Sequence, residues 1–178
     1  MLDIDQLRYP IGKFAPLTSY TIEEKKKLIT EIANLPAQLA EVVKHFSKEQ
    51  FTTPYRDGGW SVQQLIHHIA DSHMHSYIRF KWALTEEKPV IKAYEEKIWA
   101  ETIDNQLDPA LSISLITSFH AKWSAMLSLL DDDAWHRSFI HPQTQKEINL
   151  ERMLALYAWH GKHHLAHITS LKERMKWS

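Results

Sequence analysis

Four long stretches of this sequence repeat apolar residues at intervals of three and four, the period of one face of an α-helix. They cover about residues 21–46, 61–84, 109–130 and 150–175. The chain has only four glycines and seven prolines, so it has few tight turns and favours long helices over a many-stranded sheet. We therefore expect an all-α fold, a four-helix bundle with long connecting loops, in a single domain over residues 1–178.

A residue that favours a helix N-cap begins or directly precedes each stretch. In the first two stretches a Glu or Gln follows the cap three residues later, which is the capping-box pattern. Pro36 lies inside the first stretch, and because proline lacks a backbone N–H we expect it to kink that helix or split it in two. The four predicted caps are Thr21, Ser61, Asp108 and Asn149.

The segments between the helices carry weaker patterns. Residues 1–20 are predicted to form an ordered arm packed on the surface by apolar anchors. We expect residues 85–107 to form a loop with a short helical turn that covers another part of the protein. We expect residues 134–149 to form a loop or a small hairpin. The acidic run 131–133 is unfavourable at a helix C-terminus, so we expect it to cap the segment that follows. The anchors expected in the arm are Tyr9, Ile11, Phe14 and Leu17.

Composition narrows the classes of function. A net charge of −1 gives no basic excess for nucleic-acid binding, and no apolar run approaches the roughly 18–20 residues of a membrane span. The first five residues are acidic and lack the apolar core of a secretory signal, so the expected location is cytoplasmic. The chain has no cysteine, which excludes thiolate ligands and a cysteine nucleophile. A metal would therefore need His, Asp or Glu ligands, and imidazoles suit zinc, nickel, copper or iron rather than magnesium or calcium.

Histidines occupy apolar positions in the last predicted helix. His160 and His164 lie four residues apart, which stacks both rings on one face about 6 Å apart, as two ligands of one metal ion require. Gly161 stands where the zinc-protease motif HExxH has its glutamate. In a chain with twelve histidines a lone pair at this spacing is more often structural than metal-binding, so the metal interpretation depends on a third ligand. The apolar members of the stripe are Met153, Tyr157, Ile168 and Leu171.

The second predicted helix offers that third ligand in two adjacent histidines. Its apolar stripe places His68 on the shoulder of the buried face and turns His67 further away, so the helical phase favours His68. His73 lies on the buried stripe and is interpreted as a hydrogen-bonded core histidine. The residues that set the phase are Val62, Leu65, Ile66 and Ile69.

Three further histidines have less defined positions. His75 and His163 are interpreted as residues on the shoulders of their helices. His167 lies one turn beyond His164. It is interpreted either as a residue that contacts and orients a metal ligand or as a spare ligand.

Several local sequences of this chain match one known pattern. The segment Gly-Gly-Trp-Ser at 58–61, His-His at 67–68 and Tyr-Ala-Trp-His-x-x-x-His-x-x-His at 157–167 together resemble the DinB-like superfamily. More narrowly the chain is similar to its YfiT branch of metal-dependent hydrolases, and the resemblance covers nearly the whole sequence. Further segments that resemble this branch are Arg8–Gly12, Tyr55–Trp60, Asp71–Met74, Tyr77–Lys81 and Leu84–Glu87.

The resemblance implies a four-helix bundle with one divalent metal, zinc or nickel, held by three histidines. One ligand comes from the second helix and two come from the last. Carried over to this chain, the ligands are His68, His160 and His164, which agrees with the phase argument. The relatives also imply a homodimer.

Three interpretations of function stay open. A three-histidine site leaves a coordination position for water, and a metal there makes a hydroxide nucleophile near neutral pH, which is hydrolase chemistry on a small-molecule substrate. The same position can hold a low-molecular-weight thiol as thiolate, as in thiol-dependent S-transferases that the resemblance also implies. The third interpretation is a metal-stabilised binding protein without catalysis, which would unfold when its metal is removed.

The catalytic groups are less defined than the ligands. Asp71, one turn from His68, is a candidate for orienting an imidazole or acting as a base, or else it is a solvated helix residue. Tyr157 can donate to an oxyanion or pack in the core. Arg56 and Arg79 can receive an acidic substrate or a thiol cofactor, or else form salt bridges. The tryptophans that flank the ligand motifs, interpreted as core residues or pocket walls, are Trp60 and Trp159.

Overall fold

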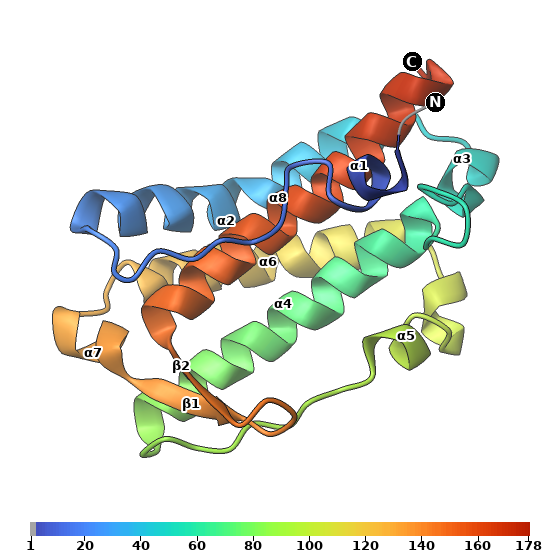
Figure 1. The fold of residues 1–178 in the computed structure, drawn as a ribbon. Helices are drawn as coiled ribbons and strands as arrows, with labels where there is room; N and C mark the ends of the chain where they lie inside the picture. Colours follow the sequence, from blue (N-terminus) through green and yellow to red (C-terminus); the bar gives the residue numbers. More distant parts are fainter. Residues whose placement is uncertain (1–2) are drawn as a thin grey trace.

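The computed structural model describes residues 3–178 and contains four long helices that form a bundle (Figure 1). Helix α8 packs against α2 and α4, and α6 packs against the same two helices from the other side. Consecutive helices α2 and α4 therefore lie at opposite corners of the bundle, as do α6 and α8, and long connections join them. The four helices are α2 (Ile22–Val43), α4 (Val62–Thr85), α6 (Pro109–Leu127) and α8 (Leu150–Met175).

Shorter elements fill the connections. Segment 134–149 contains an antiparallel hairpin of β1 (Ser138–His141) and β2 (Lys146–Asn149), so of the two predicted forms the hairpin is correct. The expected helical turn in segment 85–107 is present as α5 (Glu96–Trp99), and a 3-10 turn follows it. The remaining short elements are α1 (Ile4–Arg8), α3 (Lys48–Thr52), η1 (Ile103–Gln106) and α7 (Asp132–His136).

The helix starts follow the predicted capping. The side chain of Thr21 accepts a hydrogen bond from the backbone N–H of Glu24, and Ser61 and Asn149 cap α4 and α8 in the same way. Asp131 caps α7, so the acidic run serves the segment that follows it, as expected. Helix α2 continues through Pro36 as one element, so the predicted split is wrong. The carbonyl of Ile32, which Pro36 leaves without a helical donor, accepts a hydrogen bond from the His120 side chain instead.

Residues 3–20 of the N-terminal arm are ordered, whereas residues 1 and 2 lie outside the described residues, and only part of the predicted anchoring is present. In Figure 1 it lies along α8. Tyr9 and Phe14 are half-buried, and the Phe14 ring lies 5.8 Å from the ring of Trp159. Ile11 and Leu17 are 44% and 55% exposed, so they are not anchors. An arm without a helical period gives no rule for which of its apolar side chains face inward.

The buried core is divided along the bundle. One apolar cluster, which includes Phe80, Trp123 and Met153, fills the end near the hairpin. A second, which includes Leu39 and Ile69, fills the other end. Between them each of α4, α6 and α8 contributes buried histidines, so a polar layer crosses the middle of the bundle. Such a layer is costly unless its polar atoms are paired or bind a ligand.

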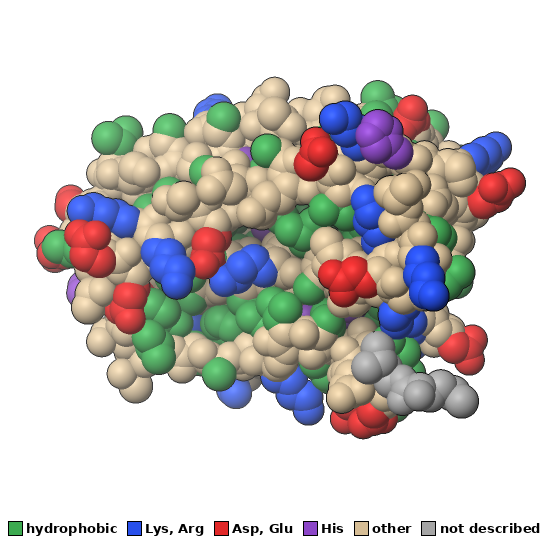
Figure 2. Space-filling view, turned by 90° about the horizontal axis from the view of Figure 1, so that it is seen from above, with side chains coloured by type: hydrophobic (Ala, Val, Ile, Leu, Met, Phe, Trp, Pro, Cys, Tyr) green, Lys and Arg blue, Asp and Glu red, His purple; other side chains and the backbone are tan. Residues whose placement is uncertain are grey.

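The outer surface does not suggest a polyanionic partner. Figure 2 shows acidic and basic side chains interspersed over the face that it presents, in keeping with a net charge of −1. None of the helices in the described part of the chain is both long and apolar enough to cross a membrane.

Candidate metal centre

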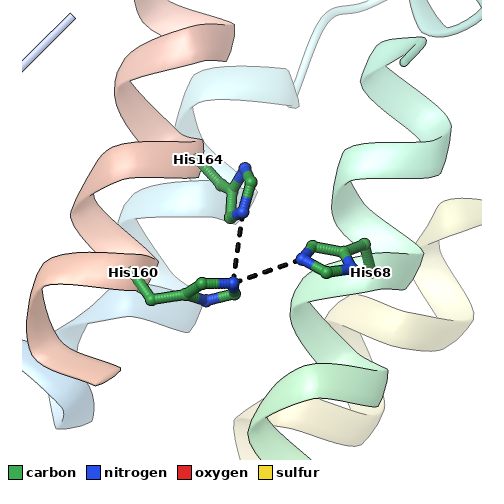
Figure 3. Close-up of side chains that lie close together, drawn as sticks. All are labelled: His68, His160 and His164. Atoms are coloured by element: carbon green, nitrogen blue, oxygen red, sulfur yellow. Dashed lines mark hydrogen bonds between the residues drawn. The ribbon is translucent and has the colours of Figure 1, made fainter. Parts of the chain in front are cut away.

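Three histidines from two helices point toward one another in the polar layer (Figure 3). The Nε2 atom of His160 on α8 lies 3.2 Å from Nε2 of His68 on α4 and 3.2 Å from Nε2 of His164, one turn further along α8. All three nitrogens lie within 4.8 Å of one another. These are the three residues that the sequence and the resemblance predict as ligands, and the fold brings them together.

The geometry of this triad fits a divalent ion. Two nitrogens that each lie about 2.0–2.1 Å from a tetrahedral zinc are about 3.3 Å apart, close to the separations around His160. Burial lowers the pKa of His68 to about 4, and burial together with the neighbouring histidines lowers the pKa of His160 and His164 well below the usual value. The imidazoles are therefore neutral at physiological pH, which is the form that binds metal.

Two more buried histidines continue inward from His160. Its Nδ1 atom lies 3.2 Å from Nε2 of His73, and Nδ1 of His73 lies 3.1 Å from Nε2 of His120 on α6. Nδ1 of His120 lies 2.8 Å from the backbone carbonyl oxygen of Ile32 on α2. His73 and His120 have no solvent exposure, so bulk water does not reach their ring nitrogens. The contacts above are therefore the hydrogen bonds that these two rings make. We call this chain from Ile32 to His160 the histidine relay.

The carbonyl at its end sets the direction of every hydrogen bond in the relay. A carbonyl oxygen only accepts, so Nδ1 of neutral His120 carries the proton and its Nε2 accepts from His73. Nε2 of His73 then accepts from Nδ1 of His160. The Nε2 lone pair of His160 is thereby left free and directed at the triad. A hydrogen bond to the second nitrogen is how metal-binding histidines are oriented and held in one tautomer.

Pro36 explains why the Ile32 carbonyl is available. In an α-helix this carbonyl would accept from the N–H of residue 36, but proline has none. The buried proline therefore does not break α2. It releases one acceptor toward the core, and His120 uses that acceptor.

The adjacent His67 is directed away from the triad, as the helical phase predicts. Its ring nitrogens lie 2.8 Å from Oγ of Ser112 and 3.2 Å from the carbonyl oxygen of Leu107, both on the side of α6. His75 is half-buried and stacks on the ring of Tyr94 at 4.2 Å.

A second group of histidines lies beside the triad on α8. His163, His164 and His167 also bring ring nitrogens within 4.8 Å of one another. Nε2 of His167 donates to the backbone carbonyl of Arg8 at 3.1 Å, so the N-terminal arm holds that ring in one tautomer. The Nδ1 atoms of all three rings are buried without a partner among the described residues. The sequence predicted His163 as a shoulder residue, yet it is buried in this group.

Two cavities open on either side of the triad. One has a volume of about 470 Å³ and reaches His160, and we call it the His160 cavity. The other, of about 650 Å³, reaches His164 and is called the His164 cavity. Glu96 and Lys97 at the start of α5 line both. The segment predicted as a cover therefore lies over the histidine centre.

The other predicted site residues occupy different positions. The hydroxyl of Tyr157 lies 3.3 Å from Oγ of Ser72 and lines the His160 cavity, whereas Asp71 lines neither cavity. Burial and the nearby Asp104 raise the pKa of Asp71 to about 6.

Arg56 lines the His164 cavity and donates to the Tyr55 hydroxyl. Of the two tryptophans, Trp60 lines the His164 cavity and lies 4.6 Å from the ring of His68, whereas Trp159 lines neither cavity and stacks on His163.

Gly161 permits the close approach of α8 to α2. A Cβ atom at this position would lie 2.5 Å from Cδ2 of Leu35 and 3.4 Å from Cε1 of His73. The face of α8 next to His160 is therefore packed against the core.

His120 is the site residue that sequence reasoning missed. It follows Ile116 by four residues and precedes Trp123 by three, so it lies on the buried stripe of the third helix. A histidine on a buried apolar stripe, as at His73, is the sequence signal that could have indicated this member of the polar layer.

Comparisons with known proteins identify the family of this chain. The model of the DinB superfamily matches residues 31–168. The chain is 49% identical over 173 residues to a Bacillus subtilis protein named “Putative metal-dependent hydrolase YfiT”, covering 97% of both chains. It is 47% identical over 171 residues to a Bacillus mycoides protein that also carries the name “Putative metal-dependent hydrolase”, covering 96% of this chain and 98% of that one.

A solved structure extends the similarity to the fold. It is described as “YfiT from Bacillus subtilis is a probable metal-dependent hydrolase with an unusual four-helix bundle topology”. This chain matches it with a TM-score of 0.95 at 49% identity, over 97% of this chain and 99% of the other. The diagonal placement of consecutive helices is the architecture that the two proteins share. With a family model matched over most of its length and relatives similar from end to end, this chain belongs to the DinB superfamily.

Proposed function

We propose that this protein is a metal-dependent hydrolase whose single divalent ion is held by His68, His160 and His164. The observation that carries the proposal is the convergence of three neutral Nε2 atoms, with separations of 3.2 Å around His160. The names of the relatives support it, since two similar Bacillus proteins are called metal-dependent hydrolases. Three protein ligands leave a position open, as catalytic zinc sites do.

An ion bound there would supply Lewis acidity and make water a nucleophile near neutral pH. The protein's own residues do the rest. The histidine relay keeps the Nε2 lone pair of His160 directed at the ion. The segment around α5 covers the centre and limits access of bulk water.

Tyr157 is our candidate for stabilising an oxyanion. Its hydroxyl lines the His160 cavity, and burial raises its pKa, so it stays protonated and able to donate. Asp71 remains the candidate base that the sequence predicts, with a pKa of about 6 that suits proton transfer near neutral pH. Because Asp71 lines neither cavity, a role in catalysis requires a water or a movement of the cover between it and the centre.

All-nitrogen ligation favours zinc or nickel over magnesium or calcium, and we propose one of these two as the native metal. A homodimer and a cytoplasmic location are further parts of the proposal. Exposed leucines on α6, Leu111 and Leu115, offer an apolar face to a second copy.

A turnover assay tests the proposal. Protein loaded with one equivalent of zinc or nickel is compared with the His160→Ala variant on ester, amide and phosphate-ester substrates. We expect hydrolysis by the loaded protein and none above background by the variant. A parallel reaction supplies an electrophile with and without a low-molecular-weight thiol. Consumption of the electrophile only with thiol, without hydrolysis of any substrate, would replace the hydrolase by an S-transferase.

A further inference from the structure

Among residues 3–178, one buried charge has no counter-charge. Arg79 on α4 is only 8% exposed, and it lines the His160 cavity. Its Nε–H is buried without a partner, and the structure shows no hydrogen bond or ion pair for its guanidinium within residues 3–178. The sequence left salt bridges open as a role for this arginine, and no salt bridge to it is present in that range.

Lys25 is a buried cation that, unlike Arg79, has a carboxylate partner. Lys25 is equally buried at 8%, and its Nζ lies 3.0 Å from a carboxylate oxygen of Glu151, itself 4% exposed. An unpaired buried charge costs far more than a paired one, so such a group persists where a ligand completes it. Arg79 therefore points to an anion that residues 3–178 do not supply.

The surroundings of Arg79 include further polar atoms without partners. Ser76, one turn before it on α4, has no exposure and no partner for its hydroxyl within the described residues. Nδ1 of His141, on β1, is also buried without a partner there, and His141 lines the same cavity. Three charged residues of the cover line the cavity as well, but they are exposed and solvated: Glu95, Glu96 and Lys97.

The cavity joins this cation to the metal centre. Its lining includes both Arg79 and His160, together with Ser72 and Tyr157 between them. Arg79 follows His68 by eleven residues, about 16 Å along the axis of α4. A volume of about 470 Å³ suits a small molecule that spans the two ends.

We propose that Arg79 binds an anionic group of the substrate, a carboxylate or phosphate, at the end of the His160 cavity remote from the scissile bond. This inference rests on the proposed hydrolase function and specifies its substrate class. The planar guanidinium fork matches either oxyanion with two hydrogen bonds. Tyr94, which lines the same cavity, carries a hydroxyl that can add a neutral donor to it.

Binding is tested first, without any turnover. The metal-loaded full-length protein is titrated with succinate, with inorganic phosphate and with neutral succinamide, while the Nε–H resonances of its arginines are followed by NMR. We expect the Arg79 resonance, assigned by its loss in Arg79→Met, to shift with succinate or phosphate and not with succinamide. A shift with only one of them identifies that oxyanion as the preferred group. No shift of this resonance with either anion would overturn the proposal.

Specificity is tested with a matched pair of esters, monoethyl succinate and diethyl succinate. Arg79→Met should lower kcat/KM for the charged half-ester about 10- to 100-fold and leave the neutral diester within a few-fold. Arg79→Lys should retain part of the preference. Equal losses on both esters would mean that Arg79 serves the fold, and the inference would fail. If the wild-type protein hydrolyses neither ester, the hydrolase proposal fails for these substrates, while the NMR titration still decides whether Arg79 binds an anion.

Unfolding of the ligand-free variants provides a third readout. Removing an unpaired buried charge should leave the midpoint of thermal unfolding of Arg79→Met equal to or above that of wild type. As the matched comparison, Lys25→Met breaks a buried pair and should lower the midpoint. A fall in Arg79→Met as large as that in Lys25→Met would show a hidden structural partner and overturn the assignment.

Discussion

Pro36 and His120 are linked through one carbonyl: the proline leaves the oxygen of Ile32 without its helical donor, and His120 donates to it at 2.8 Å. Through His73 this contact determines which nitrogen of His160 is free. A proline in α2 and a proposed metal ligand in α8 are thus connected by three hydrogen bonds.

Replacing His120 should weaken metal binding although His120 does not reach the ion. In His120→Leu, His73 loses its acceptor and can adopt the other tautomer, which no longer fixes His160. We expect the zinc dissociation constant to rise about 10- to 100-fold, as for other partners behind metal ligands. Competition with a chromophoric chelator measures it. The matched control is His67→Leu, another buried histidine with a backbone partner but outside the relay, and an equal loss there would contradict the prediction.

Restoring the backbone N–H at position 36 should lower the affinity for metal without lowering the stability of the metal-free protein. In Pro36→Ala the new N–H competes with His120 for the Ile32 carbonyl, so zinc affinity should fall several-fold. The metal-free protein should not lose unfolding free energy, because an interior proline costs a helix about 3 kcal/mol relative to alanine. Urea unfolding and chelator competition on the same sample give both quantities. Unchanged zinc affinity would show that the relay does not depend on Pro36.

The ligand assignment itself has a stoichiometric test. His68→Ala, His160→Ala and His164→Ala should each lose bound metal, measured by elemental analysis after gel filtration. His67→Ala should keep it. Full retention of metal in His160→Ala would mean that the site lies elsewhere, for example on the His163 and His167 side of α8.

The metal-free protein should lose stability as the pH falls below neutral. Burial lowers the pKa of His68, His120 and His163 to about 4 in the folded protein, against about 6.5 when unfolded. Between these values the unfolded chain binds more protons, so the unfolding free energy falls from about pH 6.5 toward pH 4 and is level above this window. Urea unfolding at several pH values measures the slope. His120→Leu should flatten it, and a slope unchanged by that substitution would contradict the assignment.

Much of the architecture could be predicted because it is encoded locally. The caps at Thr21, Ser61 and Asn149 act within one turn of their own helices, so their sequence patterns sufficed. The choice of His68 over His67 followed from helical phase, which fixes the direction of a side chain once the buried stripe is known.

What could not be predicted depends on contacts between distant segments. The acceptor of His120 is a backbone atom 88 residues away, and no side-chain pattern marks a free carbonyl. The exposed Ile11 and Leu17 lie in an arm without a period, where hydrophobicity alone does not tell which residues face the bundle. The isolation of Arg79 is likewise a property of its surroundings, because a sequence shows a cation but not the absence of its partner.

The tight packing at Gly161 has a consequence for how this scaffold can diversify. In zinc proteases one helix carries both the metal ligands and the proton-transferring glutamate between them. Here a Cβ atom at that intervening position would lie 2.5 Å from Cδ2 of Leu35, so in the proposed site α8 supplies ligands and no such glutamate. Proton transfer and substrate choice then fall to other elements, α4 and the cover among them. Changes in those elements can alter the reaction while the ligands stay in place, which separates the evolution of chemistry from the evolution of the metal site.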